Sequence, residues 1–471
     1  MATFVFFCIS SCTTNQKPSG DPVKWTVSTN QNRWKEKNEL LISKSMATDT
    51  VNIEVLKDQK QQLFEGFGAC FNELGWDALA VLGTNEKDSV MKSLFDLNQG
   101  LRLSIFRMPI GANDYSKNWY SLNETDGDYE MKKFNIDRDK TILIPYIKAA
   151  QKYNPNLKVW ASPWCPPSWM KSNKSYACRP DINNDLSPEK AGKEGVTQFI
   201  MDSKTLTAYA LYFTKFIKAY QEQGIPIVAV HVQNEPNSCQ NFPSCVWTAK
   251  DLNTLIGEYL GPKLESEKLA TDIWLGTIER PSVEKVDTVL SDAKSSKYVK
   301  GVGFQWAGKG AIAGVHQKYP NIKLMQTETE CGNGSNDWAA AEYTFDLMKH
   351  YFTHGVCMYM YWNMVLDETG KSQWGWKQNS MISIDKTTKK VKYNPEYHLF
   401  KHFSYYIKSG AYKLKTSGDY QDILAFINPD GETVLIAKNS TELAKTITIK
   451  IGDKTLKPIL EPKSFNTFLV K

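Results

Sequence analysis

The sequence predicts an α/β protein in which a closed (β/α)8 barrel, the TIM-barrel fold, carries an antiparallel β-sandwich as a side domain. Two patterns lead to this prediction. Between residues 64 and 395, eight short apolar runs rich in β-forming residues alternate with longer amphipathic segments, and strands that alternate with helices form a parallel sheet. After residue 395, apolar residues recur at every second position between turn signals, which is typical of antiparallel strands.

The eight apolar runs have the length of single strands, and eight strand–helix units are the number that closes a barrel. In chain order the runs read FGACF, LSIFRMPIG, LKVWASPW, PIVAVHVQ, DIWLGTIE, YVKGVGFQW, IKLMQTE and VCMYMYWN. Active sites of such barrels lie at the carboxyl ends of the strands. Polar residues at the ends of these runs are therefore the first candidates for a functional site.

The segments on either side of the barrel are expected to build the side domain. Residues 396–471 open with a helical segment and continue with DILAFINPDGETVLIAKN, in which a Pro-Asp-Gly turn predicts a hairpin. Residues 25–63 have similar strand content and are expected to add strands to the same domain. Residues 64–395 remain as the barrel itself.

Residues 1–24 resemble an export leader followed by a flexible linker. Their apolar stretch is too short to cross a bilayer and is typical of a secretory signal. The run ISSC, which ends at Cys12, resembles a bacterial lipobox, although the basic residues that usually precede one are absent. We therefore expect an exported bacterial protein, periplasmic or at the outer membrane or cell surface. Membrane attachment through a lipidated Cys12 is a further expectation.

The amino-acid composition limits the kinds of molecule that this protein is expected to bind. The chain has 41% apolar and 23% charged residues among its 471, which is ordinary for a folded globular protein. The 57 basic and 51 acidic residues are spread along it without dense basic blocks, so no nucleic acid partner is expected. The 14 Trp, 22 Tyr and 21 Phe residues are a more specific signal, because aromatic faces stack on the C–H faces of sugars as well as filling cores.

No metal or cofactor is expected. The cysteines lack CxxC spacing and do not form a zinc-binding pattern. Two histidine pairs are spaced i,i+4 on helical segments, His350 with His354 and His398 with His402, but neither has an evident third ligand. Packing is the default interpretation for both pairs.

Seven of the nine cysteines lie after the leader. In an oxidising compartment Cys239 and Cys245 could form a disulfide, and Cys165 with Cys178 is a weaker candidate. Free buried thiols are the alternative for both pairs.

Carboxylates at two strand ends are the strongest functional signal. Glu235 ends the fourth run, and Glu328 and Glu330 end the seventh. The 93 positions from Glu235 to Glu328 correspond to three βα units of about 31 residues, which brings both strand ends to the same rim. Two carboxylates that face each other across a cleft are the groups that cleave a glycosidic bond.

The motifs around these carboxylates resemble glycoside hydrolase family 30 of clan A, and in particular its acid β-glucosidase or glucosylceramidase branch. The resemblance covers about residues 60 to 410, and the β-rich tail agrees with the side domain of that family. Its matching pieces are EGFGACFNELGWDAL, FRMPIGANDYS, VWASPWCPPSWMKSN, HVQNEPNSCQNFPSCVW, YMYWNMVLD and YHLFKHFS.

The resemblance implies a role for each residue of the pair. Glu235 is expected to be the general acid/base, and Glu328, which follows Thr327, the nucleophile. Glu330 is the rival nucleophile, because two residues apart on a strand both side chains face the same way. Asn234 is expected to bind the 2-hydroxyl of the sugar.

Further residues are implied in substrate binding. Arg107 matches the basic residue of the family near the nucleophile, where a fixed guanidinium keeps a carboxylate ionised. Asp114 matches a carboxylate that holds sugar hydroxyls, and Trp164 and Trp362 match aromatic walls. At the sixth strand this chain has GFQWAGKG where the glucosylceramidase branch has His-Trp-Tyr, so the wall at Trp306 and the leaving-group preference stay open.

The sequence thus predicts an exported retaining β-glycosidase that acts on β-glucosyl linkages through two glutamates, with glucosylceramide, β-1,6-glucan or smaller β-glucosides as substrates. In such an enzyme the acid is protonated and the nucleophile ionised at rest, and the two carboxyl groups are about 5 to 5.5 Å apart. The alternatives are another clan-A specificity, for xylan or a fucose-containing substrate, and a non-catalytic glycan-binding lipoprotein.

Overall fold

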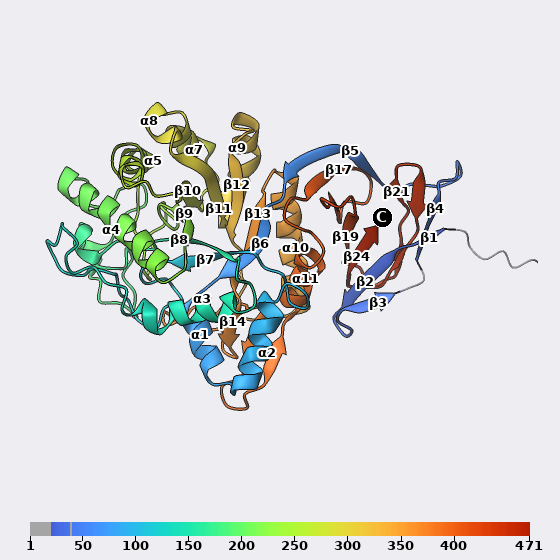
Figure 1. Cartoon of the computed structure of the whole chain (residues 1–471), viewed down its shortest axis with the longest axis horizontal. Helices are drawn as coiled ribbons and strands as arrows, with labels where there is room; N and C mark the ends of the chain where they lie inside the picture. The colour runs from blue at the N-terminus through green and yellow to red at the C-terminus, as the bar shows by residue number, and fades with distance from the viewer. Residues whose placement is uncertain (1–19, 38–39) are drawn as a thin grey trace, which may run out of the picture.

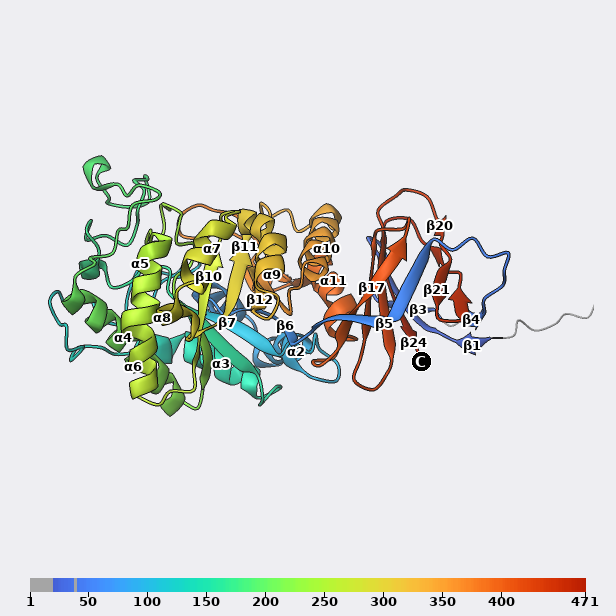
Figure 2. The same cartoon turned by 90° about the horizontal axis from the view of Figure 1, so that it is seen from above.

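The computed structural model describes residues 20–37 and 40–471. A barrel domain and a β side domain lie next to each other along the longest axis of the molecule (Figure 1, Figure 2). The chain begins in the side domain, leaves it through the long strand β5 (Ile53–Leu63), and returns to it after helix α11 (Pro395–Ser404).

Eight parallel strands within residues 40–471 close into the barrel, and each coincides with one of the eight apolar runs. They follow one another around the barrel in chain order, and the last strand pairs with the first, Met358 opposite Gly66. The predicted (β/α)8 fold is confirmed. The strands are β6 (Gly66–Cys70), β7 (Ile105–Pro109), β8 (Lys158–Ser162), β9 (Ile227–His231), β10 (Asp272–Ile278), β11 (Val299–Gln305), β12 (Lys323–Glu328) and β13 (Met358–Asn363).

Helices connect consecutive strands and cover the outside of the barrel (Figure 1). They are α1 (Glu73–Ala80), α2 (Thr84–Phe95), α3 (Leu143–Gln151), α4 (Ser203–Glu222), α5 (Ala249–Thr254), α6 (Gly261–Ser266), α7 (Val283–Leu290), α8 (Ala293–Ser296), α9 (Ile312–Lys318) and α10 (Trp338–Thr353). Shorter helical turns interrupt the loops at η1 (Asp139–Thr141), η2 (Ser168–Met170), η3 (Pro188–Lys190), η4 (Leu255–Leu260) and η5 (Trp306–Ala311). Side-chain caps start several helices, such as Asp202 before α4.

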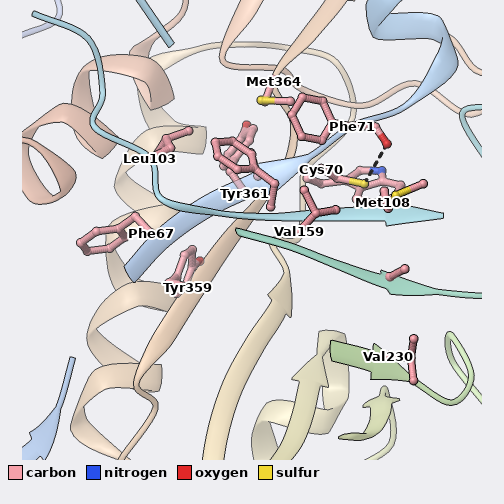
Figure 3. Packing of buried hydrophobic residues seen from close by; sticks show 14 of the residues in the cluster. Phe67, Cys70, Phe71, Leu103, Met108, Val159, Val230, Tyr359, Tyr361 and Met364 are labelled. Atoms are coloured by element: carbon pink, nitrogen blue, oxygen red, sulfur yellow. Dashed lines mark hydrogen bonds between the residues drawn. The ribbon is translucent and has the colours of Figure 1, made fainter. Parts of the chain in front are cut away.

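Alternation along each strand separates two cores. Successive side chains of a strand point to opposite faces. On β13, Met358 and Met360 therefore fill the barrel interior, together with Trp160 of β8, while Tyr359 and Tyr361 point outward. Both tyrosines pack against Phe400 of α11, with ring centroids 5.9 and 5.3 Å apart, and belong to the apolar layer between strands and helices shown in Figure 3.

The side domain is the predicted β-sandwich, and its main sheet is antiparallel except that β21 runs parallel to β5. Its main sheet has the strand order β1-β4-β22-β21-β5-β17-β18-β19-β24-β2-β3 and folds over its own apolar core. A short pair, β20 and β23, and a separate sheet, β14-β15-β16, complete the described strands. The remaining bounds are β1 (Asp21–Pro22), β2 (Lys24–Thr29), β3 (Lys35–Lys37), β4 (Leu41–Lys44), β14 (Val365–Asp367), β15 (Ile382–Ile384), β16 (Val391–Tyr393), β17 (Tyr412–Gly418), β18 (Ile423–Ile427), β19 (Thr433–Asn439), β20 (Lys445–Thr446), β21 (Ile449–Ile451), β22 (Lys454–Leu456), β23 (Ile459–Leu460) and β24 (Ser464–Val470).

The barrel core continues into the side domain. Phe426 of β18 packs against Phe64 and Phe352, with ring centroids 6.2 and 5.6 Å apart. Phe465 of β24 packs against Trp338 of α10 at 4.6 Å. Buried aromatic contacts of this kind hold the two domains in a fixed arrangement.

The structure corrects the predicted disulfides. Cys165, Cys178, Cys239 and Cys245 are all free thiols in the described part of the chain, so both predicted pairings are wrong and the free-thiol alternative holds. Residues 1–19, which include Cys12, lie outside the described residues. Among the helices of the described ranges, none is both long and apolar enough to pass through a bilayer.

Candidate active site

A cavity of about 300 Å³ opens at the carboxyl ends of the barrel strands. Glu235 and Glu328 both face it, as the sequence predicted from the strand ends. The other residues around it come from the loops that follow β7 to β13: Asp114, Trp164, Asn234, Ser238, Gln240, Phe242, Glu279, Arg280, Trp306, Ala307, Trp376 and Gln378.

Glu235 lies just beyond β9, where the chain leaves the sheet. Its backbone has a left-handed φ of 46°, which costs free energy for a non-glycine residue and needs support from its surroundings. That support comes from Thr277, whose carbonyl accepts a hydrogen bond of 3.1 Å from the Glu235 N–H. The carboxyl itself is buried and accepts hydrogen bonds from Gln240 Nε2 and Gln305 Nε2, both 3.0 Å long.

Glu328 is the last residue of β12 and is 5% exposed. One carboxylate oxygen accepts a 2.9 Å hydrogen bond from Arg107, and the other a 3.1 Å hydrogen bond from the indole N–H of Trp306. Gln305 lies opposite Glu328 in the register of β11 and β12. Both oxygens of Glu328 are therefore held, one by Arg107 of β7 and the other by Trp306 of η5.

Gln305 connects the two glutamates. Its Nε2 lies 3.0 Å from Oε1 of Glu235 and 3.3 Å from Oε2 of Glu328. Those two oxygens can be no farther apart than the sum of these distances, which is below the roughly 6.5 to 9.5 Å of inverting glycosidases. This upper limit is shorter than the inverting range, so the geometry suits a nucleophile that attacks the sugar directly.

Arg107 of β7 is completely buried and organises the floor of the cavity. Its guanidinium donates to Glu328, to Asn234 Oδ1 at 2.6 Å and to Ser162 Oγ at 3.0 Å, and lies 4.2 Å from the ring centre of Trp164. A buried guanidinium with such fixed partners places a positive charge beside one glutamate only. It fixes Asn234 at the same time.

The environment of each glutamate alters its pKa. Burial raises the pKa of Glu328 to about 7, and the nearby Arg107 guanidinium acts in the opposite direction. Burial also raises the pKa of Glu235, against the hydrogen bonds from Gln305 and Gln240. Because Arg107 contacts Glu328 and not Glu235, negative charge is more stable on Glu328. The contribution of Arg107 is therefore a preference for the proton on Glu235, and it acts against the burial of Glu328.

Of the predicted sugar-binding residues, Asp114 and Trp164 line the cavity, and Trp362 packs against Trp164 with indole centroids 5.5 Å apart. Within the described residues, Oδ1 of the buried Asp114 and Nε1 of Trp362 have no hydrogen-bond partner. Buried polar atoms are nearly always paired, so the oxygen of the cavity-lining Asp114 fits a position where a substrate hydroxyl would supply the missing partner.

The side chains of Glu330 and Glu328 lie in different surroundings, although the two residues are only two positions apart. Strand β12 ends at Glu328, so the alternation that would place both side chains on one face no longer applies. The Glu330 carboxylate turns outward, where it forms a 2.6 Å ion pair with Lys309 and accepts a 2.6 Å hydrogen bond from Tyr343. It lies outside the cavity.

Several cavity residues were missed at the sequence level. Glu279 directly follows β10, and the rule that selected Glu235 and Glu328 also applies to it, so the sequence contained its signal. Gln240 and Trp376 lie in long loops, where no periodic pattern indicates which side chain turns inward. Gln305 belongs to the run GFQWAGKG, to which the sequence assigns no role, yet it lies between the two carboxylates.

The barrel and its paired, buried glutamates define this class of protein: it is a glycoside hydrolase, an enzyme of sugar-bond hydrolysis. More particularly, the chain belongs to glycosyl hydrolase family 30. The model of the TIM-barrel domain of that family matches residues 64–407, and the model of its beta sandwich domain matches residues 410–468.

Known relatives agree with this assignment. The chain is 31% identical to putative glucosylceramidase 1 of Caenorhabditis elegans, over 84% of this chain and 77% of that protein. It is 26% identical to the endo-1,6-beta-D-glucanase neg1 of Aspergillus fumigatus, over 87% and 86%. The crystal structure of SrfJ from Salmonella typhimurium superimposes with a TM-score of 0.86 at 23% identity, covering 96% of this chain and 99% of that one, which shows the shared fold.

Proposed function

We propose that this protein is an exported, retaining β-glycosidase that hydrolyses β-glucosyl linkages, with Glu328 as nucleophile and Glu235 as general acid/base. One observation carries the proposal: two buried glutamates on β12 and beyond β9 face the same cavity and share the hydrogen-bond donor Gln305. Only carboxyl groups at such short range can serve one anomeric carbon by double displacement.

In the first step, the protonated Glu235 gives its proton to the glycosidic oxygen while a Glu328 oxygen attacks the anomeric carbon. The bond from that carbon to the leaving oxygen breaks, the leaving group departs as an alcohol, and a glycosyl ester forms on Glu328. Arg107 and Trp306 hold the attacking carboxylate in place before the reaction. Asn234, fixed by Arg107, is positioned to contact the sugar.

In the second step, Glu235 is the base. Its carboxylate accepts a proton from water, the water oxygen attacks the anomeric carbon, and the ester bond to Glu328 breaks. The sugar leaves with its original configuration, and both glutamates regain their starting protonation. The proton preference set by Arg107 is the one that the first step requires.

The substrate class is supported by the relatives. One is named as a glucosylceramidase and another as an endo-1,6-beta-glucanase, and both names describe cleavage of a β-glucosyl bond. The paired tryptophans Trp164 and Trp362, with Asp114 beside them, provide an aromatic and hydrogen-bonding wall suited to one glucosyl unit.

The direct test follows the anomer that forms first. With an aryl β-glucoside, proton NMR during the first minutes should show β-glucose before mutarotation, and 2-deoxy-2-fluoro-β-glucosyl fluoride should attach covalently to the peptide that contains Glu328. Glu330→Gln is the matched control and should still be labelled. Initial α-glucose would contradict the retaining mechanism, and no hydrolysis of any β-glucoside would favour the glycan-binding alternative.

Export is proposed from the leader alone, and it has its own test. If Cys12 carries a lipid, the mature protein in its bacterial host should fractionate with membranes, and Cys12→Ala should release it. Mass spectrometry of the mature N-terminus should begin at Cys12 and show the added acyl mass. A soluble wild-type protein that retains residues 1–12 would exclude the lipoprotein proposal.

A further inference from the structure

We propose that the acid/base side of the cavity is a binding subsite for a sugar leaving group, so that the preferred substrate is a glucoside of another sugar, such as a β-linked glucan or oligosaccharide. This inference rests on the proposed function, because it uses Glu235 as the general acid. It adds a choice between a sugar and a lipid alcohol as the group that leaves.

The position of this subsite follows from the chemistry. A general acid must reach the oxygen of the departing group, so that group lies on the side of Glu235 away from the wall of Asp114 and Trp164. Residues on that side come from the loop after Glu235 and from the end of β10. They are Ser238, Gln240, Phe242, Glu279 and Arg280, with the indole of Trp376 across from them.

Trp376 provides an aromatic platform. Its ring lies 6.0 Å from the ring of Phe242 and 6.4 Å from that of Trp306, measured between centroids, and 39% of the residue stays exposed. Hydrogen bonds between its backbone and Ser372 close the loop that carries it. A half-exposed indole held at a cavity mouth is suited to stacking on the apolar face of a sugar ring.

Polar groups surround this platform. Glu279 is 1% exposed and accepts hydrogen bonds from the Asn237 N–H at 2.9 Å and from Ser238 Oγ at 2.8 Å. Arg280 is held by a 2.7 Å ion pair with Glu194. Glu279 therefore has a fixed position before a ligand arrives, and the partly exposed guanidinium of Arg280 lies at the same edge of the cavity.

This combination selects for hydroxyl groups. An aromatic face together with carboxyl, guanidinium and amide groups is the typical lining of a sugar site, where each hydroxyl finds a donor or an acceptor. A lipid alcohol would bring methylene groups against the partly exposed Gln240 and Arg280, and desolvating these polar groups without new hydrogen bonds is unfavourable. The subsite therefore favours a sugar.

The test compares two substrates that differ only in the leaving group. β-Glucosyl fluoride releases fluoride and makes no use of the subsite, whereas gentiobiose, the β-1,6-linked glucose disaccharide, must place a glucose there. Trp376→Ala should lower kcat/KM for gentiobiose about 10-fold more than for the fluoride, and Arg280→Met should lower it in the same sense but less. Tyr343→Ala, which removes an exposed ring outside the cavity, should leave the ratio of the two rates unchanged.

The outcomes separate this inference from the proposed function. If the wild type fails to hydrolyse β-glucosyl fluoride, the proposed function itself is wrong. If it hydrolyses the fluoride but Trp376→Ala reduces both substrates equally, the subsite is wrong and the proposed function stands. Glucosylceramide in mixed micelles is the third arm, and a higher kcat/KM for this lipid than for gentiobiose would also overturn the inference.

Discussion

The active site and a cluster where α11 meets the side domain both bury polar side chains, but these differ in how completely they are hydrogen-bonded. At the barrel rim, Asp114 and Trp362 each retain a buried polar atom without a partner among the described residues. At the boundary with the side domain, the imidazole of His402 on α11 has both nitrogens paired, with Thr467 Oγ1 and with Ser28 Oγ, each at 2.9 Å. The barrel site is incomplete without a ligand, whereas the histidine cluster is complete in itself.

The pKa values of the buried groups also differ between the active site and the histidine cluster. Burial raises the pKa of Glu328 to about 7, inside the range in which an enzyme works. Burial lowers the pKa of His402 to about 3, so this histidine stays neutral and only packs. In a cavity at the strand ends, an unpaired polar atom and a carboxyl with a pKa near neutrality mark a candidate functional site, whereas the fully paired His402 is structural. Five predictions test this distinction, in order of decreasing effect.

The largest effect is expected from Glu328→Gln. Removing the nucleophile eliminates the glycosyl ester, so kcat for an aryl β-glucoside should fall on the order of 10⁴-fold or more. Circular dichroism should stay close to wild type, whereas the melting temperature should fall, because the amide oxygen can accept from only one of the two donors, Arg107 and Trp306. Residual activity above a few per cent of wild type would show that another residue attacks the sugar.

Glu235→Gln should have a smaller effect that depends on the leaving group. General acid catalysis contributes about 10² to 10⁴-fold, so hydrolysis of a disaccharide should fall by that factor. β-Glucosyl fluoride, which needs little protonation, should suffer much less in its first step. An equal loss for both substrates would contradict the assignment of the acid.

Arg107→Met should shift the pH dependence. Arg107 lowers the pKa of Glu328 against the effect of burial, so its removal should raise that pKa on the order of one unit or more. The acidic limb of the kcat/KM profile, below which the nucleophile is protonated, should therefore move to higher pH. An unchanged acidic limb in a folded variant would show that this guanidinium does not control the pKa of the nucleophile.

His402→Gln should change stability but not catalysis. Loss of one buried hydrogen bond should cost about 1 to 3 kcal/mol in the free energy of unfolding, measured by urea denaturation at pH 7, with kcat unchanged. The folded-state pKa of His402 is lowered from 6.5 to about 3, so its contribution is present above pH 6.5 and is lost as pH falls toward 3. The wild type should thus lose stability more steeply than the variant over this range.

The smallest effect is expected from Glu330→Gln. This carboxylate lies outside the cavity and pairs with Lys309, so kcat/KM should stay within about 3-fold of wild type, as expected for a partly exposed ion pair. The measurement is paired with Glu328→Gln on the same substrate. A loss comparable to that variant would reverse the roles assigned to the two neighbouring glutamates.

Much of the fold and of the candidate site could be predicted from the sequence. The alternation of apolar runs with amphipathic segments specified the barrel, because the period of the hydrophobic pattern is a local property of each segment. The polar residues directly after those runs included Glu235 and Glu328, because a parallel barrel brings all its strand ends to one rim. The same local rule points to Glu279, which directly follows β10.

The sequence by itself therefore determined the fold class, the rim that carries the site and a short set of candidate carboxylates. Only the tertiary structure showed that Glu328 lies in the cavity and Glu330 outside it, because the strand ends between them and their side chains separate. It also decided that the paired cysteines remain thiols, and that Gln305 and Trp376 join the cavity. Those choices depend on distances between segments far apart in the chain, and no local pattern records such distances.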